Sequence, residues 1–336
     1  MMGPFVARRL LQMVPVLLGV SILTFALTNL LPGDPARAAA GRHANAEQLE
    51  AVRDRLGLDR PLPVQYAMYM GRLLQGDLGT SLTSKQAVAE ELRLFFPATL
   101  ELLLATMVIA VSVGIPLGVF TATRRGSWAD RAFLGFSYFG VGMPVFFMAL
   151  LLQIVFAGWL RVLPIAGRLG LETVPPPTFT GMYTVDALLV GQWTTLLDAL
   201  RHLLLPALTL AMAGTSEVAR ITRRSMLQAL DQEYVRTARA KGFPERTVWL
   251  RHALPNALLP TTTVIGLQVA FLLGGTVLIE NLFSWGGLGT YAWTGIFRMD
   301  IPVIMGITLI ATTVYLIVNL GVDLVYARLD PRIRYE

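Results

Sequence analysis

The stretch LLLATMVIAVSVGIPLGVFTAT, residues 102–123, holds 22 consecutive uncharged residues between Glu101 and Arg124. A helix needs about 20 apolar residues to cross the ~30 Å hydrocarbon core of a bilayer, so this stretch is long enough to span a membrane. Uncharged runs of similar length or longer occupy residues 10–33, 132–160, 252–279 and 301–322. A shorter run, 202–216, continues past Glu217 to residue 219. We predict an all-α polytopic membrane protein with six transmembrane helices, with five spans plus a re-entrant segment as the alternative.

The composition excludes an ordinary soluble domain. Charged residues make up 15% of the 336 residues and hydrophobic residues 54%, whereas soluble domains carry about 25% charged residues. The formal net charge is +6. In a membrane protein such an excess marks cytoplasmic loops, so we expect the lipid bilayer and no nucleic acid as a partner. The chain has no cysteine, which rules out disulfides, thiolate metal sites and cysteine nucleophiles.

The basic residues are distributed unevenly between the connections. Residues 220–255 hold eight Lys and Arg against three acids, whereas residues 159–200 hold two against three and residues 280–302 one against two. Because cytoplasmic loops carry the excess of Lys and Arg, this bias places both termini and the 220–255 loop in the cytoplasm. Residues 32–98 balance eight basic against eight acidic side chains and fall outside by alternation.

These observations divide the chain into segments. They are an N-terminal anchor helix (1–31), an outer segment with short helices (32–98), a five-helix core (99–325) and a cytoplasmic tail (326–336). Core spans are expected at about 99–123, 132–158, 202–219, 256–279 and 302–323, with the cytoplasmic loop at 220–255. The first apolar run exceeds the 7–15 residues of a secretory signal, so we expect a retained anchor.

The segments outside the core spans also carry local signals. Apolar residues at helical spacing in AEQLEAVRDRLGL (46–58) predict an amphipathic helix that ends at Gly57, and VQYAMYMGRLLQ (64–75) predicts a second one. VPPPTFTG (174–181) predicts an extended arm before a short helix around Asp186–Leu200. Kinks or local unwinding are expected at the prolines inside the spans, which are Pro15, Pro116, Pro144 and Pro206.

Motifs for catalysis and nucleotide binding are missing. The sequence contains no G-x-x-x-x-G-K-[ST], H-E-x-x-H or G-x-S-x-G, so we assign no catalytic, cofactor-binding or metal-binding residue and expect no enzyme activity. Three acids stand at span ends, and we expect them to cap helices or pair with arginines: Glu101, Glu217 and Asp323. Without an internal ion relay, such a protein is either driven by another subunit or is a passive channel. No residue is assigned to a substrate pathway.

The 220–255 loop carries the start and stop signals of two short helices. Residues 233–241 are good helix formers, Gly242 suits a left-handed helix stop, and Pro244 suits the first turn of a following helix. Small residues (Thr237, Ala238, Ala240) alternate with cations (Arg236, Arg239, Lys241). We predict a docking element in which small side chains allow close approach of a soluble partner and cations pair with its acidic groove; a merely basic cytoplasmic loop is the alternative.

The sequence of this loop resembles a motif of a known family. EYVRTARAKG (233–242), with Leu254-Pro255 downstream, resembles the EAA loop of ABC importer permeases, and RTARAKG is similar to its peptide branch. Arg236-Thr237-Ala238 occupies the EAA position. The resemblance assigns ATPase coupling to Glu233, Tyr234, Arg236, Thr237, Ala238, Arg239, Ala240, Lys241, Gly242, Leu254 and Pro255. Further similar stretches are LPGDP (31–35), GDLGTS (76–81), ATLEL (98–102), RRGSWADR (124–131), LFSWGGLG (282–289) and DPRIRY (330–335).

The resemblance implies a type I ABC importer permease fold in the bacterial inner membrane, and specifically the first (B-type) permease subunit of a dipeptide/oligopeptide (peptide/nickel) importer. It implies a homologous second permease subunit, two cytoplasmic ABC ATPase subunits that hold ATP and Mg, and a periplasmic or extracellular solute-binding protein. Import of a nickel complex or glutathione, a non-conducting scaffold and a membrane-embedded enzyme are the alternatives. The sequence departs from the family pattern at Gly286, where we expect proline, and at Pro255, where we expect a basic residue.

Overall fold

The computed structural model describes residues 2–30, 36, 45–57 and 59–329. These residues are predominantly helical, and among them the only strand-like pairing is an isolated bridge between Thr80 and Ala87. The LPGDP and DPRIRY stretches that carried part of the family resemblance lie outside the described residues.

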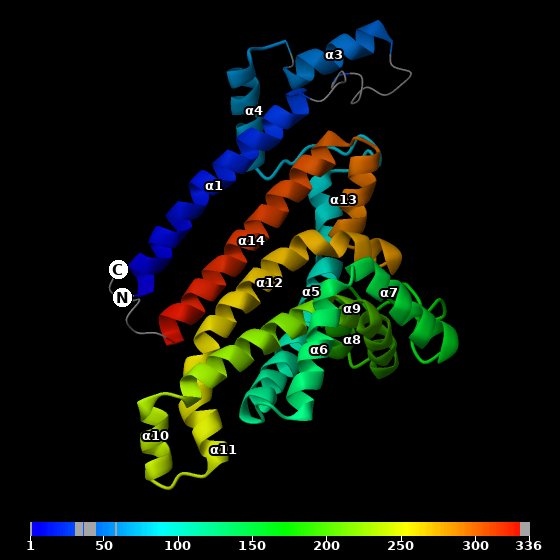
Figure 1. The fold of residues 1–336 in the computed structure, drawn as a ribbon. Helices are drawn as coiled ribbons and strands as arrows, with labels where there is room; N and C mark the ends of the chain where they lie inside the picture. The colour runs from blue at the N-terminus through cyan, green and yellow to red at the C-terminus, as the bar shows by residue number, and fades with distance from the viewer. Residues whose placement is uncertain (1, 31–35, 37–44, 58, 330–336) are drawn as a thin grey trace.

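Long helices form the body of the molecule (Figure 1). They are α1 (Met2–Leu30), α5 (Val88–Thr123), α9 (Trp193–Leu230), α12 (Leu254–Leu282) and α14 (Ile301–Leu329). Shorter helices are α3 (Ala46–Leu56), α4 (Leu62–Leu74), α6 (Trp128–Gly142), α7 (Val145–Leu152), α8 (Tyr183–Leu189), α10 (Glu233–Ala240), α11 (Glu245–Thr247) and α13 (Leu288–Phe297). Two π-helical segments, Gln153–Trp159 and Val248–Ala253, extend α7 and precede α12.

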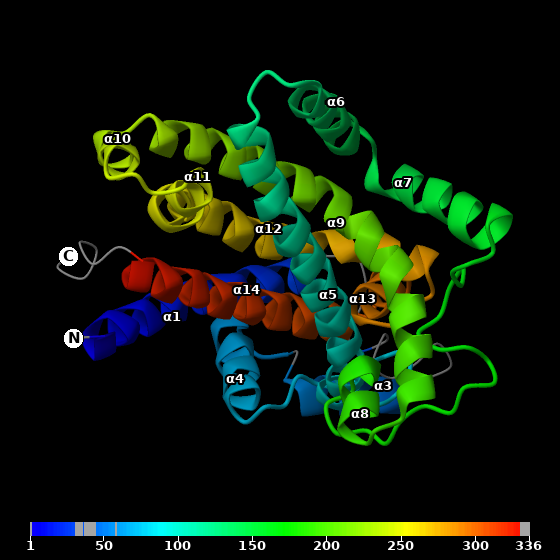
Figure 2. The same cartoon turned by 90° about the horizontal axis from the view of Figure 1, so that it is seen from below.

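The packing centre is the pair formed by α5 and α9, which cross closely in Figures 1 and 2. Their backbones approach through Gly114 and Gly118, four residues apart on α5. A Cβ added at Gly118 would lie 2.6 Å from the Ala219 carbonyl oxygen, and one at Gly114 2.9 Å from Val218. Small residues at this spacing let membrane helices pack at short range. The core is therefore built around a small-residue contact that the uncharged-run analysis did not single out.

Several predicted elements are confirmed. The amphipathic signals at 46–58 and 64–75 correspond to α3 and α4, and Gly57 has the positive φ of a helix stop. Pro144 interrupts the third predicted span, because α6 ends at Gly142 and α7 begins at Val145. Residues 174–178 have no regular secondary structure, in line with the extended arm.

Other boundaries differ from the prediction. The short helix expected around Asp186–Leu200 is instead α8, after which residues 193–200 already belong to α9. Helix α9 also continues through the basic residues up to Leu230, so part of the predicted loop is helical. Helix α5 begins at Val88, and α13 was not predicted. For α5 and α9 the reason is the same: an uncharged run shows the apolar part of a helix, and the helix continues where its residues become polar. Helix α13 differs, because it lies in an uncharged stretch that is too short to span a membrane.

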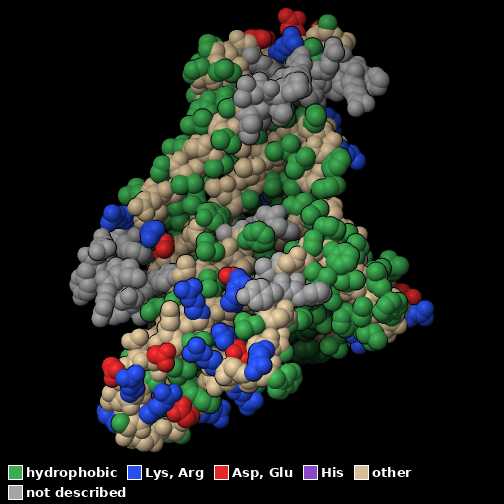
Figure 3. All heavy atoms as spheres, viewed as in Figure 1, with side chains coloured by type: hydrophobic (Ala, Val, Ile, Leu, Met, Phe, Trp, Pro, Cys, Tyr) green, Lys and Arg blue, Asp and Glu red, His purple; other side chains and the backbone are tan. Residues whose placement is uncertain are grey.

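Four helices of the described part are long and apolar enough to cross a membrane: Val6–Ala26, Val88–Thr123, Trp193–Leu230 and Ile301–Leu324. The apolar helix Val145–Trp159 is shorter, and the predicted fifth span falls within α12. Hydrophobic side chains cover the middle of the molecule, and charged side chains gather over α10 and α11 (Figure 3). The six-span count and the side on which each terminus lies stay predictions.

Helix α1 lies at the edge of the molecule alongside α14. Most of its large apolar side chains are exposed, including Leu11 and Leu23, as expected of a helix surrounded by lipid. Its polar side turns toward α4, where the Ser21 hydroxyl lies 2.8 Å from the Tyr66 hydroxyl. In Figures 1 and 2 the beginning of α1 and the end of α14 lie toward the same end of the molecule as α10.

Candidate functional site

The most prominent candidate site is a helical hairpin that protrudes at one end of the molecule (Figure 1). Helix α10 follows α9 after a two-residue link, Asp231 and Gln232, and the chain returns through α11 and the π-helical segment 248–253 into α12. The hairpin therefore connects two of the long core helices directly.

Gly242 ends α10 as the sequence predicts. Its φ is +79°, a left-handed conformation that glycine adopts without steric cost. The Gly242 N–H donates to the Arg239 carbonyl (2.9 Å) and the Phe243 N–H to the Ala238 carbonyl (3.4 Å). This pair of bonds is the Schellman arrangement that satisfies free carbonyls at a helix end.

The base of the hairpin is apolar. Val235 and Ala238, one helical turn apart on α10, belong to a buried cluster with Met226 of α9 and with Val248 and Ala253 of the π-helical segment that precedes α12. Ala238 is 4% exposed. The expectation that Ala238 lies on a surface available for close approach is therefore wrong: the apolar face of α10 packs against its own support, as the amphipathic period of the helix dictates.

The other predicted site residues divide into two groups. Exposed side chains or backbone are found at Glu233, Tyr234, Arg236, Thr237, Arg239, Ala240, Lys241, Gly242 and Pro255, whereas Leu254 is half-buried. The Tyr234 hydroxyl accepts a hydrogen bond from Asn256 Nδ2 (3.0 Å), which ties α10 to the start of α12. The exposed face of α10 is thus presented by a rigidly seated helix.

Two of the expected docking cations are already paired within the hairpin. Arg236 contacts Glu233 (2.7 Å), and Arg239 contacts Glu245 (2.9 Å). The Arg239 guanidinium lowers the pKa of Glu245 below its usual value. Such exposed pairs contribute about 0–1 kcal/mol, so a partner could exchange them at little cost. Lys241, Arg246 and Arg251 form no ion pair in the part of the chain that the structure describes.

A buried ion pair braces the adjacent end of α9. Arg223 donates two hydrogen bonds to the Asp130 carboxylate, from Nε (2.7 Å) and Nη2 (2.8 Å), and the Gly126 N–H donates a third (2.9 Å). Asp130 is 3% exposed. The hydrogen-bonded guanidinium holds the pKa of Asp130 below its usual range. The sequence analysis counted both residues only as loop charges and missed this link between α6 and α9.

The three acids at span ends make the expected pairs. Glu101 contacts Arg168 (2.7 Å) and also accepts hydrogen bonds from the backbone and hydroxyl of Thr184. Glu217 pairs with Arg220, and Asp323 lies 3.1 Å from Arg9. The Glu101 network ties α5 to α8 through Thr184 and, through Arg168, to the Gly181 carbonyl of the arm before α8.

A fourth acid, Glu280, was counted in the sequence analysis only as a loop charge and was not singled out with the other three. It is fully buried, and its carboxylate accepts hydrogen bonds from the Thr99 hydroxyl and from the N–H groups of Gly289 and Thr290. It thereby fixes the start of α13 against α5 and α12. Nearby Gly286 has φ +68°, which a proline ring cannot adopt. The turn observed here therefore requires the glycine that stands where the family pattern has proline. Pro255 lies in the first turn of α12, where proline is tolerated.

Long apolar helices, an edge helix with exposed apolar side chains and a charged hairpin at one end are the features of a multi-spanning membrane protein. Residues 114–335 match the family described as binding-protein-dependent transport system inner membrane component, and residues 2–103 match the N-terminal model of such membrane components. The chain belongs to this family.

Curated relatives cover nearly the whole chain. The probable D,D-dipeptide transport system permease protein DdpB of Escherichia coli is 45% identical over 326 residues, which is 97% of this chain and 96% of that protein. The di/tripeptide transport system permease protein DppB of Pseudomonas aeruginosa is 44% identical over 333 residues, 99% of each chain. The glutathione transport system permease protein GsiC of Pectobacterium atrosepticum is 40% identical over 329 residues, 98% of each. All three are named as transport permeases and none as an enzyme.

Proposed function

We propose that this protein is the pore-forming permease subunit of an ATP-driven importer that moves dipeptides or other short peptides across the cytoplasmic membrane. The observation that carries the proposal is identity of 44–45% over essentially the full length of permeases named for dipeptide and di/tripeptide transport. The long apolar helices supply the membrane body that such a subunit requires.

We further propose that ATP and Mg²⁺ are bound by two separate cytoplasmic ATPase subunits. A homologous second permease completes the pore, and an outer solute-binding protein delivers the peptide. The family description, which names a binding-protein-dependent system, supports the last of these partners. The sequence contains no Walker A motif, which supports nucleotide hydrolysis on another chain.

The hairpin is proposed as the element that couples the ATPases to the pore. Its exposed face carries Tyr234, Thr237 and Lys241 at positions i, i+3 and i+7, so these side chains share one stripe of α10 and its end. The opposite stripe, with Val235 and Ala238, is seated on α9 and the segment before α12. A subunit that binds the exposed stripe would move both core helices as a rigid body.

One alternative substrate has an observation in its favour. The glutathione permease of Pectobacterium atrosepticum matches this chain over the same length at 40% identity, and glutathione is itself a short peptide derivative. No observation favours a nickel complex or a non-conducting scaffold.

Uptake by the reconstituted transporter tests the proposal. The permease pair, the ATPases and the binding protein would be placed in liposomes, and accumulation of radiolabelled alanylalanine would be compared with and without internal ATP. We expect ATP-dependent accumulation that excess unlabelled dipeptide suppresses. Accumulation of glutathione but not of alanylalanine would identify glutathione as the substrate. Accumulation of neither would refute the proposed function.

A further inference from the structure

The short turn that joins α5 to α6 carries a concentrated positive charge. Within the eight residues 124–131 it holds Arg124, Arg125 and Arg131, and all three side chains are exposed. None of the three forms an ion pair in the part of the chain that the structure describes. These three arginines, called the cationic patch below, are therefore not neutralised by the described residues of the protein itself.

The one acid in this part of the sequence is already engaged by another residue. Asp130 is the only Asp or Glu among residues 102–171. It is buried, and Arg223 of α9 binds its carboxylate through two hydrogen bonds. The neighbouring Arg131 donates instead to the Gly126 carbonyl (3.0 Å). The positive charge of the patch is therefore available to an anion from outside the chain.

Exposed aromatic side chains accompany the patch on both helices. Trp128, the first residue of α6, is 81% exposed, and Phe136 is exposed about two helical turns further along. On α5, Phe120 is exposed and carries the Arg124 guanidinium over its ring, with 4.5 Å between the guanidinium carbon and the ring centroid. Tryptophan and arginine gather at the headgroup level of membranes, because an aromatic ring contacts acyl chains there while a cation contacts phosphates.

The cations of the hairpin have a different setting. Arg236 and Arg239 of α10 are paired with Glu233 and Glu245. In Figure 1, α10 and α11 also extend beyond the turn between α5 and α6, away from the middle of the molecule, where hydrophobic side chains gather (Figure 3). The cationic patch therefore lies nearer to the apolar body than the hairpin does, as expected of a group at the membrane surface.

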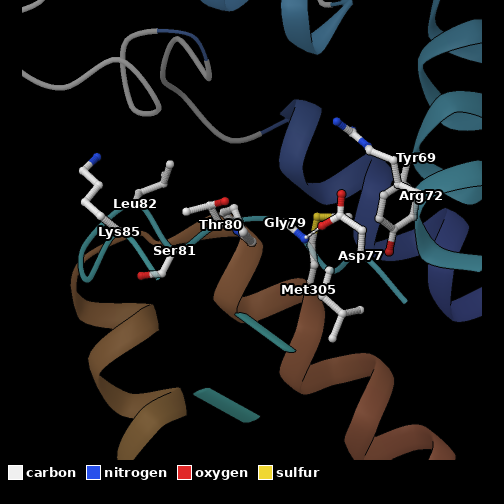
Figure 4. A pocket seen from close by; sticks show the side chains of 11 residues that line it. Tyr69, Arg72, Asp77, Gly79, Thr80, Ser81, Leu82, Lys85 and Met305 are labelled. Carbon is white, nitrogen blue, oxygen red and sulfur yellow. Dashed lines mark hydrogen bonds between the residues drawn. The ribbon is translucent and has the colours of Figure 1, made fainter. Parts of the chain in front are cut away.

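A cavity at the end of the molecule opposite the hairpin also contains basic residues. It has a volume of about 630 Å³ and lies between α4, the 77–85 loop and the start of α14 (Figure 4). Its two cations, Arg72 and Lys85, lie on opposite sides of the cavity, and Asp77 contributes a negative charge to the same lining. This cavity does not bring its cations together, whereas the turn between α5 and α6 holds three within eight residues.

We propose that the cationic patch binds an anionic phospholipid, whose phosphate contacts the guanidinium groups and whose acyl chains lie along the rings of Trp128 and Phe136. Guanidinium groups bind phosphate oxygens through charge-assisted hydrogen bonds. A soluble anion would satisfy the arginines but would leave the aromatic rings exposed, so the lipid is the occupant that fits both features. Because Asp130 and Arg223 join α6 to α9, the bound lipid holds the end of α9 that leads into the hairpin at the membrane surface.

The test measures lipid binding to the full-length chain in an uncharged detergent by native mass spectrometry, and it is independent of the proposed transport activity. Phosphatidylglycerol is compared with phosphatidylcholine of the same acyl chains and with sodium phosphate. The double variant Arg125→Gln/Arg131→Gln removes two charges from the patch. Arg246→Gln/Arg251→Gln is the matched control, because it removes two exposed arginines from the hairpin and gives the chain the same net charge.

We expect the first phosphatidylglycerol to bind about 30-fold more weakly to Arg125→Gln/Arg131→Gln than to the wild type, because each cation at an anionic lipid surface contributes about fivefold. Binding to the hairpin control should be unchanged. Trp128→Ala should also weaken binding, although it leaves the charge as it is. Size-exclusion chromatography verifies folding, and either single arginine variant, with an effect of about fivefold, suffices if the double variant does not fold.

The proposal is overturned if phosphatidylcholine binds the wild type as tightly as phosphatidylglycerol does. It is also overturned if sodium phosphate binds as tightly as the lipid, or if the patch variant binds phosphatidylglycerol as the wild type does. If the patch variant keeps lipid binding but no longer co-purifies with the ATPase, the patch is a protein-docking surface and the assignment to a lipid is wrong.

Discussion

Substitutions at two neighbouring residues of the hairpin distinguish an effect on ATPase docking from an effect on folding. Thr237 is exposed on the outer stripe of α10, whereas Ala238 is buried against α9 and the segment before α12. Replacing Thr237 with tryptophan alters stability by no more than about 0.5 kcal/mol, the usual range for exposed sites. It nevertheless places an indole ring between α10 and an ATPase subunit. We expect Thr237→Trp to fold normally and to lose transport.

The size of the effect follows from where each side chain lies. A bulky group at the centre of an interface costs at least about 2 kcal/mol of binding energy, which corresponds to about 30-fold weaker ATPase recruitment. Ala238→Trp acts differently, because Val248 and Ala253 already fill the space around the Ala238 side chain. Overpacking a buried site costs about 1–3 kcal/mol of folding stability. In that variant the hairpin unfolds locally, so any loss of ATPase binding follows from the loss of folded structure.

Three measurements on the same membranes distinguish these cases: co-purification of the ATPase, ATP-dependent alanylalanine uptake, and limited proteolysis of the 231–253 hairpin. Thr237→Trp should neither co-purify with the ATPase nor take up alanylalanine, and its hairpin should be cleaved as slowly as that of the wild type. Ala238→Trp should fail in co-purification and uptake, and its hairpin should be cleaved faster than that of the wild type. Thr237→Ser is the control, since it keeps the hydroxyl that donates to the Glu233 carbonyl. Wild-type ATPase recruitment and uptake by Thr237→Trp would show that the exposed stripe of α10 is not the docking surface.

Four further outcomes are expected. Gly118→Ala should lower the unfolding temperature at a cost of about 1–3 kcal/mol, because its Cβ would lie 2.6 Å from a carbonyl oxygen of α9, whereas Gly135→Ala, with open space around it, should not. Asp130 has a lowered pKa, so its stabilising effect is complete above about pH 5 and is lost as pH falls through the folded-state value. The unfolding temperature of Asp130→Asn should therefore be below that of the wild type at pH 7 and should depend less on pH below pH 5. A reporter fused after Arg55 should be active outside and one fused after Arg239 in the cytoplasm, and the reverse result would invert the orientation. The purified chain should show no saturable ATP binding, since it lacks a Walker A motif; isothermal titration checks this.

The sequence predicted the apolar parts of the fold well, because the requirement for about 20 uncharged residues leaves a visible record in composition. It also predicted α10 and its stop, since Gly242 meets a local conformational need. It did not predict α13 or the full lengths of α5 and α9. The extensions of α5 and α9 are polar, and α13 is short and follows a glycine-containing turn; its start is fixed by tertiary contacts such as the hydrogen bonds from Gly289 and Thr290 to the Glu280 carboxylate.

The pairing of side chains was the least predictable part of the candidate site. Nothing in the local sequence shows that Arg223 reaches Asp130 across 93 positions. Nor does it show that Ala238 faces inward, because a small residue among cations fits either face until the packing partner is known. The helical period of Val235 and Ala238 was the available signal, and it became decisive only with the buried cluster beneath it.

The length of α9 has a mechanical consequence. At about 1.5 Å per residue, its 38 residues make about 57 Å of helix, which Gly114 and Gly118 of α5 contact near Val218. Pro206 lies inside α9, and the helix changes direction along its length (Figure 2). The stretch from Val218 to Leu230 is about 18 Å long, and the stretch from Val218 back to Pro206 is also about 18 Å long. A rotation about the contact with α5 therefore moves the Pro206 bend by about as much as the hairpin end, in the opposite direction, and it is at this bend that the motion can be redirected toward α8.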